Sequence, residues 1–169
     1  MYQAPLFRQA TFSDMPDVWR IVYHAYSAYI PLLGRTPPTF LEDFDNHVAL
    51  GNLWLLDNGI EPSAMAVLTP AYDHVMIQAL CVDPQLQGRG LGRKTLLFAE
   101  QYARSLKMYQ LKLYTNSLML RNLKIYSEWG FKETHREDYS WGERVHMRKH
   151  ITRRPKPIKP FGASALALA

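Results

Sequence analysis

Cysteine is almost absent from this sequence, since Cys81 is the only one in 169 residues. An internal disulfide is therefore excluded, and a reducing cytoplasm is the compartment that we expect. Long apolar runs are missing as well, because none reaches the roughly 18 residues that a membrane-spanning helix requires. Residues 1–5 lack the basic start and apolar core of a secretory signal. These absences predict a chain without membrane association.

Acidic residues are missing from the C-terminal end. Six basic residues stand between Arg148 and Lys159 with no acid among them. Of the 20 Lys and Arg residues, the other 14 are matched by 15 Asp and Glu, so the net charge of +5 belongs to this end and not to the body. A nucleic-acid-binding protein usually spreads basic charge over a folded face, so nucleic acid is not the partner that we expect. Two interpretations of this end stay open: it docks on nucleic acid or an acidic partner, or it is a solvated linker.

Length and composition predict one domain. With 169 residues, 47% of them hydrophobic, the chain suits a single folded unit with a full core. We place this domain at residues 1–150. Residues 151–169 then form a basic, proline-containing tail that we expect to be flexible.

Hydrophobic periodicity predicts the element order βααβββαβαββ. Ser13 is a good N-cap for the first helix, residues 31–38 break that helix, and Asp57-Asn58-Gly59 is typical of a turn. Strands joined through a helix occur only in the second half. We therefore expect an α/β (α+β) fold, with a mixed, mostly antiparallel twisted sheet of six to seven strands and helices on both faces. The expected strands are residues 6–10, 53–56, 64–68, 76–82, 111–114, 131–138 and 144–149, and the expected helices are residues 13–29, 39–50, 93–106 and 118–129.

A glycine-rich loop gives the first indication of function. Residues 87–92 read Gln-Gly-Arg-Gly-Leu-Gly and stand between an apolar stretch and a helical pattern. Such a turn leaves backbone N–H groups unpaired at the positive end of a helix dipole, which is a site that binds phosphate. We therefore expect a phosphate-bearing cofactor, and a plain strand-to-helix turn is the alternative.

Spacing separates three kinds of glycine loop. A dinucleotide-binding G-x-G-x-x-G would need a glycine where this chain has Arg93, and a P-loop fails because Arg93 stands between Gly92 and Lys94. The pattern Gln/Arg-x-x-Gly-x-Gly/Ala matches residues 87–92 at every fixed position. In this respect the loop resembles the acetyl-CoA pyrophosphate loop of the GNAT superfamily of N-acetyltransferases.

A second motif strengthens the resemblance. Tyr126, followed after three residues by Gly130-Phe131, resembles the GNAT helix that ends in a tyrosine before Gly-Phe. Residues 7–11 resemble the usual opening strand, and residues 145–149 the closing strand of a bacterial branch. The resemblance covers residues 6–150, and on it the chain is identified as a bacterial-type, single-domain GNAT N-acetyltransferase.

The resemblance implies both the reaction and its residues. Acetyl-CoA would be the co-substrate, and a primary amine of a small molecule or peptide would attack it directly in a ternary complex. The backbone N–H of Leu80 would donate to the thioester oxygen. Tyr126 would be the general acid, with a core aromatic beside Trp129 as the alternative. The expected cofactor-binding residues are Val82, Gln87, Gly88, Arg89, Gly90, Leu91, Gly92, Arg93 and Asn122, of which the last is equally suited to capping a local network.

The general base stays open. Many relatives carry Glu or Asp at the position of Gln78, and a neutral amide cannot accept a proton at physiological pH. Either the amine arrives partly neutral or the base comes from elsewhere. The candidates are Asp73, His74, Glu42 and Asp43.

Other interpretations concern the cysteine, the partners and the acceptor. Cys81 is a packing residue or, alternatively, an acetyl-cysteine nucleophile. An acyl-CoA-binding regulatory module, a protein N-acetyltransferase and the use of other acyl groups remain alternatives. The oligomeric state stays open, with a homodimer as one possibility because GNAT domains often dimerise. No metal site is expected, because the histidines have no ligand-like spacing. The aromatic residues expected near the acceptor cleft, or else in the core, are Tyr23, Tyr26, Tyr29, Tyr72 and Trp141.

Overall fold

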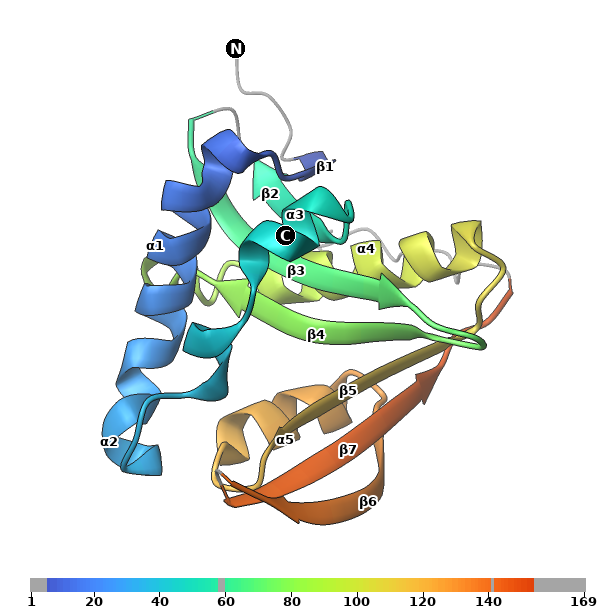
Figure 1. The fold of residues 1–169 in the computed structure, drawn as a ribbon. Helices are drawn as coiled ribbons and strands as arrows, with labels where there is room; N and C mark the ends of the chain where they lie inside the picture. Colours follow the sequence, from blue (N-terminus) through green and yellow to red (C-terminus); the bar gives the residue numbers. More distant parts are fainter. Residues whose placement is uncertain (1–5, 58–59, 141, 154–169) are drawn as a thin grey trace, which may run out of the picture.

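The computed structural model describes residues 6–57, 60–140 and 142–153. Seven strands form one sheet in the order β1-β2-β3-β4-β5-β7-β6 (Figure 1). The strands are β1 (Leu6–Gln9), β2 (Leu53–Asp57), β3 (Pro62–Pro70), β4 (Val75–Val82), β5 (Gln110–Asn116), β6 (Lys132–Tyr139) and β7 (Gly142–His150). The α-helices are α1 (Met15–Tyr26), α2 (Ile30–Leu33), α3 (Phe44–Ala49), α4 (Leu91–Ser105) and α5 (Leu120–Glu128), with 3₁₀ helices η1 (Phe12–Asp14), η2 (Ser27–Tyr29), η3 (Pro38–Leu41) and η4 (Pro84–Leu86).

The sheet is antiparallel except at one junction. β4 and β5 run parallel, and their register joins only Val75 with Leu111 and Met76 with Lys112, although β4 continues to Val82. Beyond Met76 the two strands therefore diverge, and the sheet opens between them (Figure 1). This confirms the predicted mixed, mostly antiparallel sheet, and it leaves one edge of β4 without a neighbouring strand along its second half.

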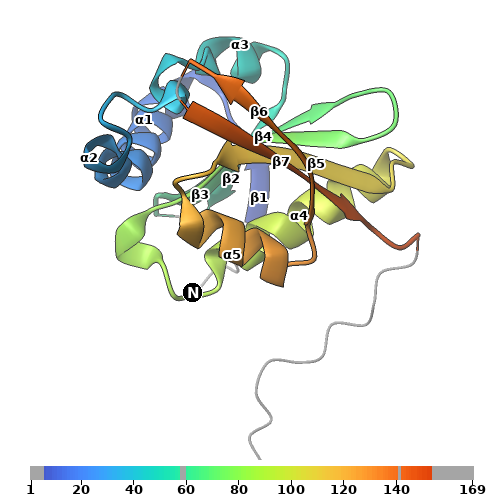
Figure 2. The same ribbon diagram turned by 90° about the horizontal axis from the view of Figure 1, so that it is seen from below.

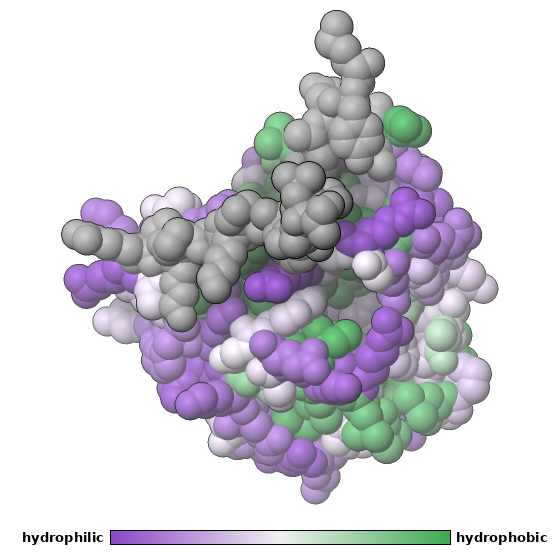
Figure 3. Space-filling model, turned by 180° about the vertical axis from the view of Figure 1, so that it is seen from behind, coloured by the Kyte–Doolittle hydropathy of each residue, from purple (hydrophilic) through white to green (hydrophobic). Residues whose placement is uncertain are grey.

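Helices cover both faces of the sheet, as predicted (Figure 2). On one face α1 and α3 bury Val18, Ile21 and Phe44 against β2, β3 and β4. On the other face α4 buries Leu96 and Ala99, and α5 packs partly buried side chains beside them. Seen from behind the view of Figure 1, hydrophilic side chains alternate with apolar patches at the surface (Figure 3). The helices α1, α3, α4 and α5 thus each turn an apolar face to the sheet.

The first helix begins differently from the prediction. Ser13 is not its N-cap, because it lies inside η1, and α1 starts at Met15. A capping box joins Thr11 and Asp14 instead, with the Thr11 backbone N–H donating to Asp14 Oδ2 at 2.7 Å. Arg8 also donates to both oxygens of Asp14, at 2.8 and 2.9 Å. The carboxylate of Asp14 therefore has enough partners to fix the start of the helix. The hydroxyl of Ser13 does not have this role.

The segment between α1 and β2 is also more divided than predicted. Pro31 does not break a helix: it lies in the first turn of α2, where its missing N–H costs nothing, and Gly34 at φ 66° ends that helix. The single helix predicted at residues 39–50 is η3 followed by α3. Glu42 is extended between them, and Asp43 caps α3 by accepting from the Asn46 N–H at 3.0 Å.

The core continues one residue beyond β7. Ile151 is buried in the core beside β7, and its N–H donates to the Tyr109 carbonyl at 3.0 Å. Three expectations lie outside the described residues: the turn at Asn58-Gly59, the ring of Trp141, and the tail from residue 154 onward. Across the part of the chain that is described, no helix is long and apolar enough to cross a bilayer.

Candidate active site

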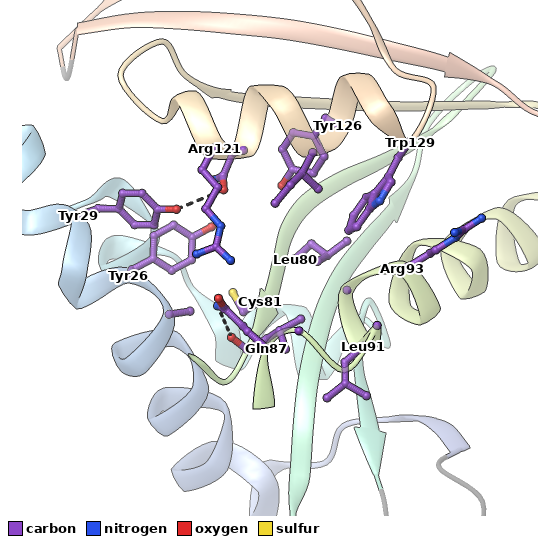
Figure 4. A pocket seen from close by; sticks show the side chains of 17 residues that line it. Tyr26, Tyr29, Leu80, Cys81, Gln87, Leu91, Arg93, Arg121, Tyr126 and Trp129 are labelled. Carbon is purple, nitrogen blue, oxygen red and sulfur yellow. Dashed lines mark hydrogen bonds between the residues drawn. The ribbon is translucent and has the colours of Figure 1, made fainter. Parts of the chain in front are cut away.

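A cavity of about 390 Å³ lies beside the second half of β4, beyond the point where β5 has diverged. Its walls come from the end of α1, the second half of β4, the glycine loop and α5 (Figure 4). Of the eleven predicted catalytic and cofactor-binding residues, Arg89 is exposed and does not line the cavity, whereas the others do. These are Leu80, Val82, Gln87, Gly88, Gly90, Leu91, Gly92, Arg93, Asn122 and Tyr126.

The glycine loop has the backbone that its sequence predicts. Gly88 and Gly90 adopt φ of 77° and 74°, a left-handed conformation that side chains disfavour, and Gly90 is the N-cap of α4. The first helical bond runs from the Lys94 N–H to the Gly90 carbonyl at 3.0 Å. The amides of Leu91 and Gly92 therefore precede the hydrogen-bonded ladder, at the positive end of a 15-residue helix that borders the cavity.

A β-bulge in β4 was not foreseen from the sequence. The register of β3 with β4 passes from Val67–Ala79 to Leu68–Ile77, which leaves Gln78 as the extra residue. Val75 and Ile77 consequently pack on the α4 side, whereas Ala79 and Cys81 pack on the α1 side. Leu80 turns to the α4 and α5 side and lines the cavity. The bulge thus re-aims β4 at the point where β5 has diverged.

Tyr126 reaches into the cavity from α5. Its ring packs edge-on against Trp129 and Phe131, at centroid distances of 6.2 and 5.9 Å, and its side chain lies toward Leu80 (Figure 4). Burial raises the pKa of the Tyr126 hydroxyl well above its usual range, and the nearby Cys81 and Tyr29 act in the same direction. The phenol is therefore neutral at physiological pH and available as a hydrogen-bond donor.

Asn122 and Cys81 also line the larger cavity. Asn122 Oδ1 accepts a hydrogen bond from the Tyr29 hydroxyl at 3.2 Å, which links α5 to η2 across the cavity (Figure 4). Cys81 is buried, and burial raises the pKa of its thiol to about 12. A thiol with that pKa is almost fully protonated at neutral pH, which argues for packing and against an acetyl-cysteine nucleophile.

A second, smaller cavity of about 80 Å³ lies beside the first. Tyr26 borders both cavities, and on β4 the consecutive residues Ala79 and Leu80 line one cavity each. Among the described residues that line the two cavities, Glu42 alone carries a carboxyl group. The rest of the smaller cavity is formed by Leu33, Pro37, Pro38, Thr39, Gln78, Tyr114, Thr115, Asn116, Met119 and Tyr139.

The side chain of Glu42 is held by His47. His47 Nε2 lies 2.8 Å from Glu42 Oε1, and His47 is buried. His47 Nδ1 is also buried, and it has no hydrogen-bond partner among the described residues. Because a carboxylate oxygen only accepts, His47 Nε2–H is the donor of this bond to Glu42.

The other candidate bases are placed elsewhere. Asp73 and His74 pair with each other at 2.6 Å in the turn between β3 and β4, and neither lines a cavity. Asp43 is occupied as the cap of α3. Of the predicted cleft aromatics, Tyr26 and Tyr29 line the larger cavity, whereas Tyr23 and Tyr72 are exposed at other positions.

Sequence reasoning missed several lining residues. Arg121 and Trp129 border the larger cavity from α5, and Tyr114 and Tyr139 border the smaller one. Arg121 stands one residue before Asn122 and is a second cation, with Arg93, on the wall of the larger cavity. Its position beside the predicted Asn122 on the same helix was the available signal.

The chain matches the family model of the acetyltransferase (GNAT) family over residues 15–131. It therefore belongs to the GNAT acetyltransferase family, whose activity is acetyl transfer from acetyl-CoA. No curated protein matches the sequence.

Solved structures share the fold. PaiA N-acetyltransferase from Thermoplasma acidophilum, in complex with coenzyme A, has a TM-score of 0.72 at 14% identity, covering 88% of this chain and 99% of that one. The ribosomal-protein-S18-alanine N-acetyltransferase from Escherichia coli has a TM-score of 0.69 at 18% identity, covering 91% and 98%. An acetyltransferase from Thermus thermophilus has a TM-score of 0.69 at 20% identity, covering 89% and 100%.

Proposed function

We propose that this protein transfers the acetyl group of acetyl-CoA to a primary amine by direct attack in a ternary complex. The observation that carries the proposal is the meeting of two cavities at Tyr26 and at the bulged part of β4. The larger cavity, bordered by the glycine loop, takes the cofactor. The smaller one takes the amine, so that the thioester and the amine approach each other beside Ala79 and Leu80.

The donor side supplies positive potential for the pyrophosphate. Backbone amides at the start of α4 border the larger cavity, and Arg93 and Arg121 are the cationic residues that line it. We assign the Leu80 N–H as the donor to the thioester oxygen. One such donor typically stabilises the developing oxyanion by ~3 kcal/mol.

The chemistry then balances within this site. The amine nitrogen attacks the thioester carbon, a C–N bond forms, and the C–S bond breaks. Tyr126 donates its hydroxyl proton to the departing sulfur, which leaves coenzyme A as a thiol. The attacking nitrogen loses one N–H proton as the C–N bond forms, and this proton restores the hydroxyl of Tyr126. When the amine arrives as an ammonium group, a base on the acceptor side takes its additional proton before the attack. The neutral Tyr126 suits this role, because it meets the thiolate as a donor.

Glu42 is the base that we assign on the acceptor side. It is the carboxylate of the smaller cavity, it is held in place by His47, and it attracts an ammonium group before taking its proton. Gln78 is part of the wall of the smaller cavity but takes no proton. Its Oε1 accepts a hydrogen bond from the Thr69 hydroxyl at 2.9 Å. A cavity of about 80 Å³ encloses only the amine-bearing end of an acceptor. Small amines and the amino end of a peptide therefore both remain within the proposal.

A panel of amines tests the proposal through the release of free thiol. Purified protein, acetyl-CoA and each amine are mixed, and the acetylated product is identified by mass spectrometry. We expect thiol release and N-acetyl product in equal amounts with at least one amine. Tight cofactor binding without amine-dependent thiol release would instead favour a regulatory acyl-CoA-binding module.

A further inference from the structure

Three metal-ligand side chains gather on one face of the β6–β7 hairpin, outside both cavities. His135 on β6 and His146 on β7 are register partners, so their side chains project on the same face. Glu137 follows His135 by two residues and shares that face. One potential ligand atom from each of the three lies within 4.8 Å of the others. We propose that His135, Glu137 and His146 bind a zinc ion.

The three ligand atoms already stand close to the spacing that such an ion requires. His146 Nε2 already lies 2.9 Å from Glu137 Oε1. Ligand atoms around a tetrahedral zinc ion stand about 3.3 Å apart, given bond lengths near 2.0–2.1 Å. Side-chain rotations that take the two rings out of their stack therefore bring three donors to one ion. Two imidazoles and one carboxylate suit Zn²⁺ and its neighbours, whereas Mg²⁺ and Ca²⁺ prefer all-oxygen sites.

The two imidazoles lie face to face, with centroids 4.1 Å apart and planes 10° apart. Because an imidazole nitrogen binds a metal in the plane of its own ring, one ring must turn out of this stack for both to bind one ion. His135 Nδ1 lies 3.2 Å from the Thr134 hydroxyl, which leaves Nε2 as the nitrogen for the ion. A hydrogen bond to the second ring nitrogen is the usual support for a metal-binding histidine.

One cation competes for the site and can withdraw from it. Arg144 Nη1 lies 3.1 Å from Glu137 Oε1. Its guanidinium is also packed between the rings of Tyr114 and Tyr139, at 4.3 and 4.4 Å from their centroids. These aromatic contacts persist when Glu137 turns toward a metal, so the ion pair with Arg144 is replaced without leaving the arginine isolated.

The site adjoins the acceptor side of the molecule without belonging to it. Tyr114 lines the smaller cavity and is the register partner of His146, with ring centroids 5.8 Å apart. Zinc bound here would join β6 to β7 next to Tyr139, which also lines that cavity. Three protein ligands leave a coordination position open to water.

Binding of Co²⁺ to the untagged full chain tests the site, because tetrahedral Co²⁺ with protein ligands absorbs visible light and Zn²⁺ displaces it. We expect one equivalent of Co²⁺ to give visible bands that one equivalent of Zn²⁺ removes. Calorimetry with Zn²⁺ should give the same stoichiometry. His135→Ala, Glu137→Gln and His146→Ala should each weaken binding at least about tenfold.

His150→Ala is the matched control, because His150 lies on the same strand and outside the cluster. It should bind as the unchanged protein does. Circular dichroism checks that each variant is folded. If an alanine variant does not fold, Glu137→Gln still tests the site, because it keeps the shape of the side chain and both histidines. Absence of Co²⁺ bands, or bands that survive in both His146→Ala and Glu137→Gln, would overturn the proposal.

Discussion

Gly92 lies against Trp129, and a Cβ built on this glycine would stand 3.1 Å from the indole Cη2. The same Cβ would stand 3.6 Å from Cγ2 of Val82. A side chain here would push the indole away by a few tenths of an ångström, so glycine suits the close approach of α4, Trp129 and the end of β4. Gly90 differs, since a Cβ added there would meet no heavy atom within 4 Å and the side chain would point into open space.

Gly90→Val should separate cofactor binding from folding. The side chain occupies the space beside the loop amides, so we expect acetyl-CoA affinity to fall about tenfold or more, which corresponds to ~1.4 kcal/mol. The positive φ also costs about 1–2 kcal/mol of stability. Isothermal titration calorimetry measures the affinity, and thermal unfolding measures the stability.

Gly34→Val supplies the control for that variant. Gly34 has φ of 66° and equally open surroundings, but it ends α2 and lines neither cavity. Its substitution should lower stability by a similar amount and leave acetyl-CoA affinity unchanged. Equal affinities of the two variants would remove the loop from the cofactor site.

Tyr126→Phe should lower kcat by about 100-fold or more, the usual contribution of a positioned general acid. Loss of one hydroxyl leaves the ring contacts with Trp129 and Phe131 in place, so acetyl-CoA affinity should hardly change. Steady-state kinetics and calorimetry measure the two quantities. Tyr102→Phe is the control, because Tyr102 packs with Trp54 and Phe98 on α4 and lines neither cavity. Normal turnover of Tyr126→Phe would show that another group protonates the thiolate.

The sequence predicted the loop and the order of helices and strands along the chain, but not the bulge. Glycine spacing and helix signals are local, so residues 87–92 could be interpreted without a structure. The bulge is not local in this sense. Residues 75–82 are apolar at every position except Gln78, as in an unbroken buried strand, and only pairing with β3 reveals that Gln78 is the extra residue. The faces of Ile77 and Ala79 therefore could not be assigned correctly from this apolar run alone.

The same limit explains why histidine spacing suggested no metal site. His135 and His146 are distant in the sequence and become neighbours through the register of β6 with β7. Glu42 was one of four candidate bases for a similar reason. Glu42 is itself the extended residue between η3 and α3, and its place in the smaller cavity depends on that conformation. Periodicity had predicted one continuous helix there.

Glu42→Gln should lower kcat by about 100-fold or more with a strongly basic amine, because the ammonium form then lacks an acceptor for its proton. The deficit should shrink with an amine whose pKa lies below the assay pH, since that amine arrives neutral. Glu128→Gln on the outer side of α5, where Glu128 pairs with Lys124 at 3.9 Å, should behave as the unchanged protein. An equal deficit for weakly and strongly basic amines would assign Glu42 to acceptor binding and not to proton transfer.

Asp14 should make stability depend on pH in the acidic range. Hydrogen bonds from Arg8, supported by those from Thr11, hold the pKa of its carboxyl well below the value of about 3.9 expected in the unfolded chain. The folded state therefore binds fewer protons, so the stabilisation is present above about pH 4 and is lost as the pH falls toward the folded pKa.

Asp14→Asn should be less stable at pH 7 and should lose less stability on acidification. Urea unfolding between pH 7 and pH 2 measures both effects, with Asp138→Asn, an exposed position on β6 outside this network, as the control. Parallel pH curves for Asp14→Asn and the unchanged protein would mean that the Arg8–Asp14 contact does not persist in solution.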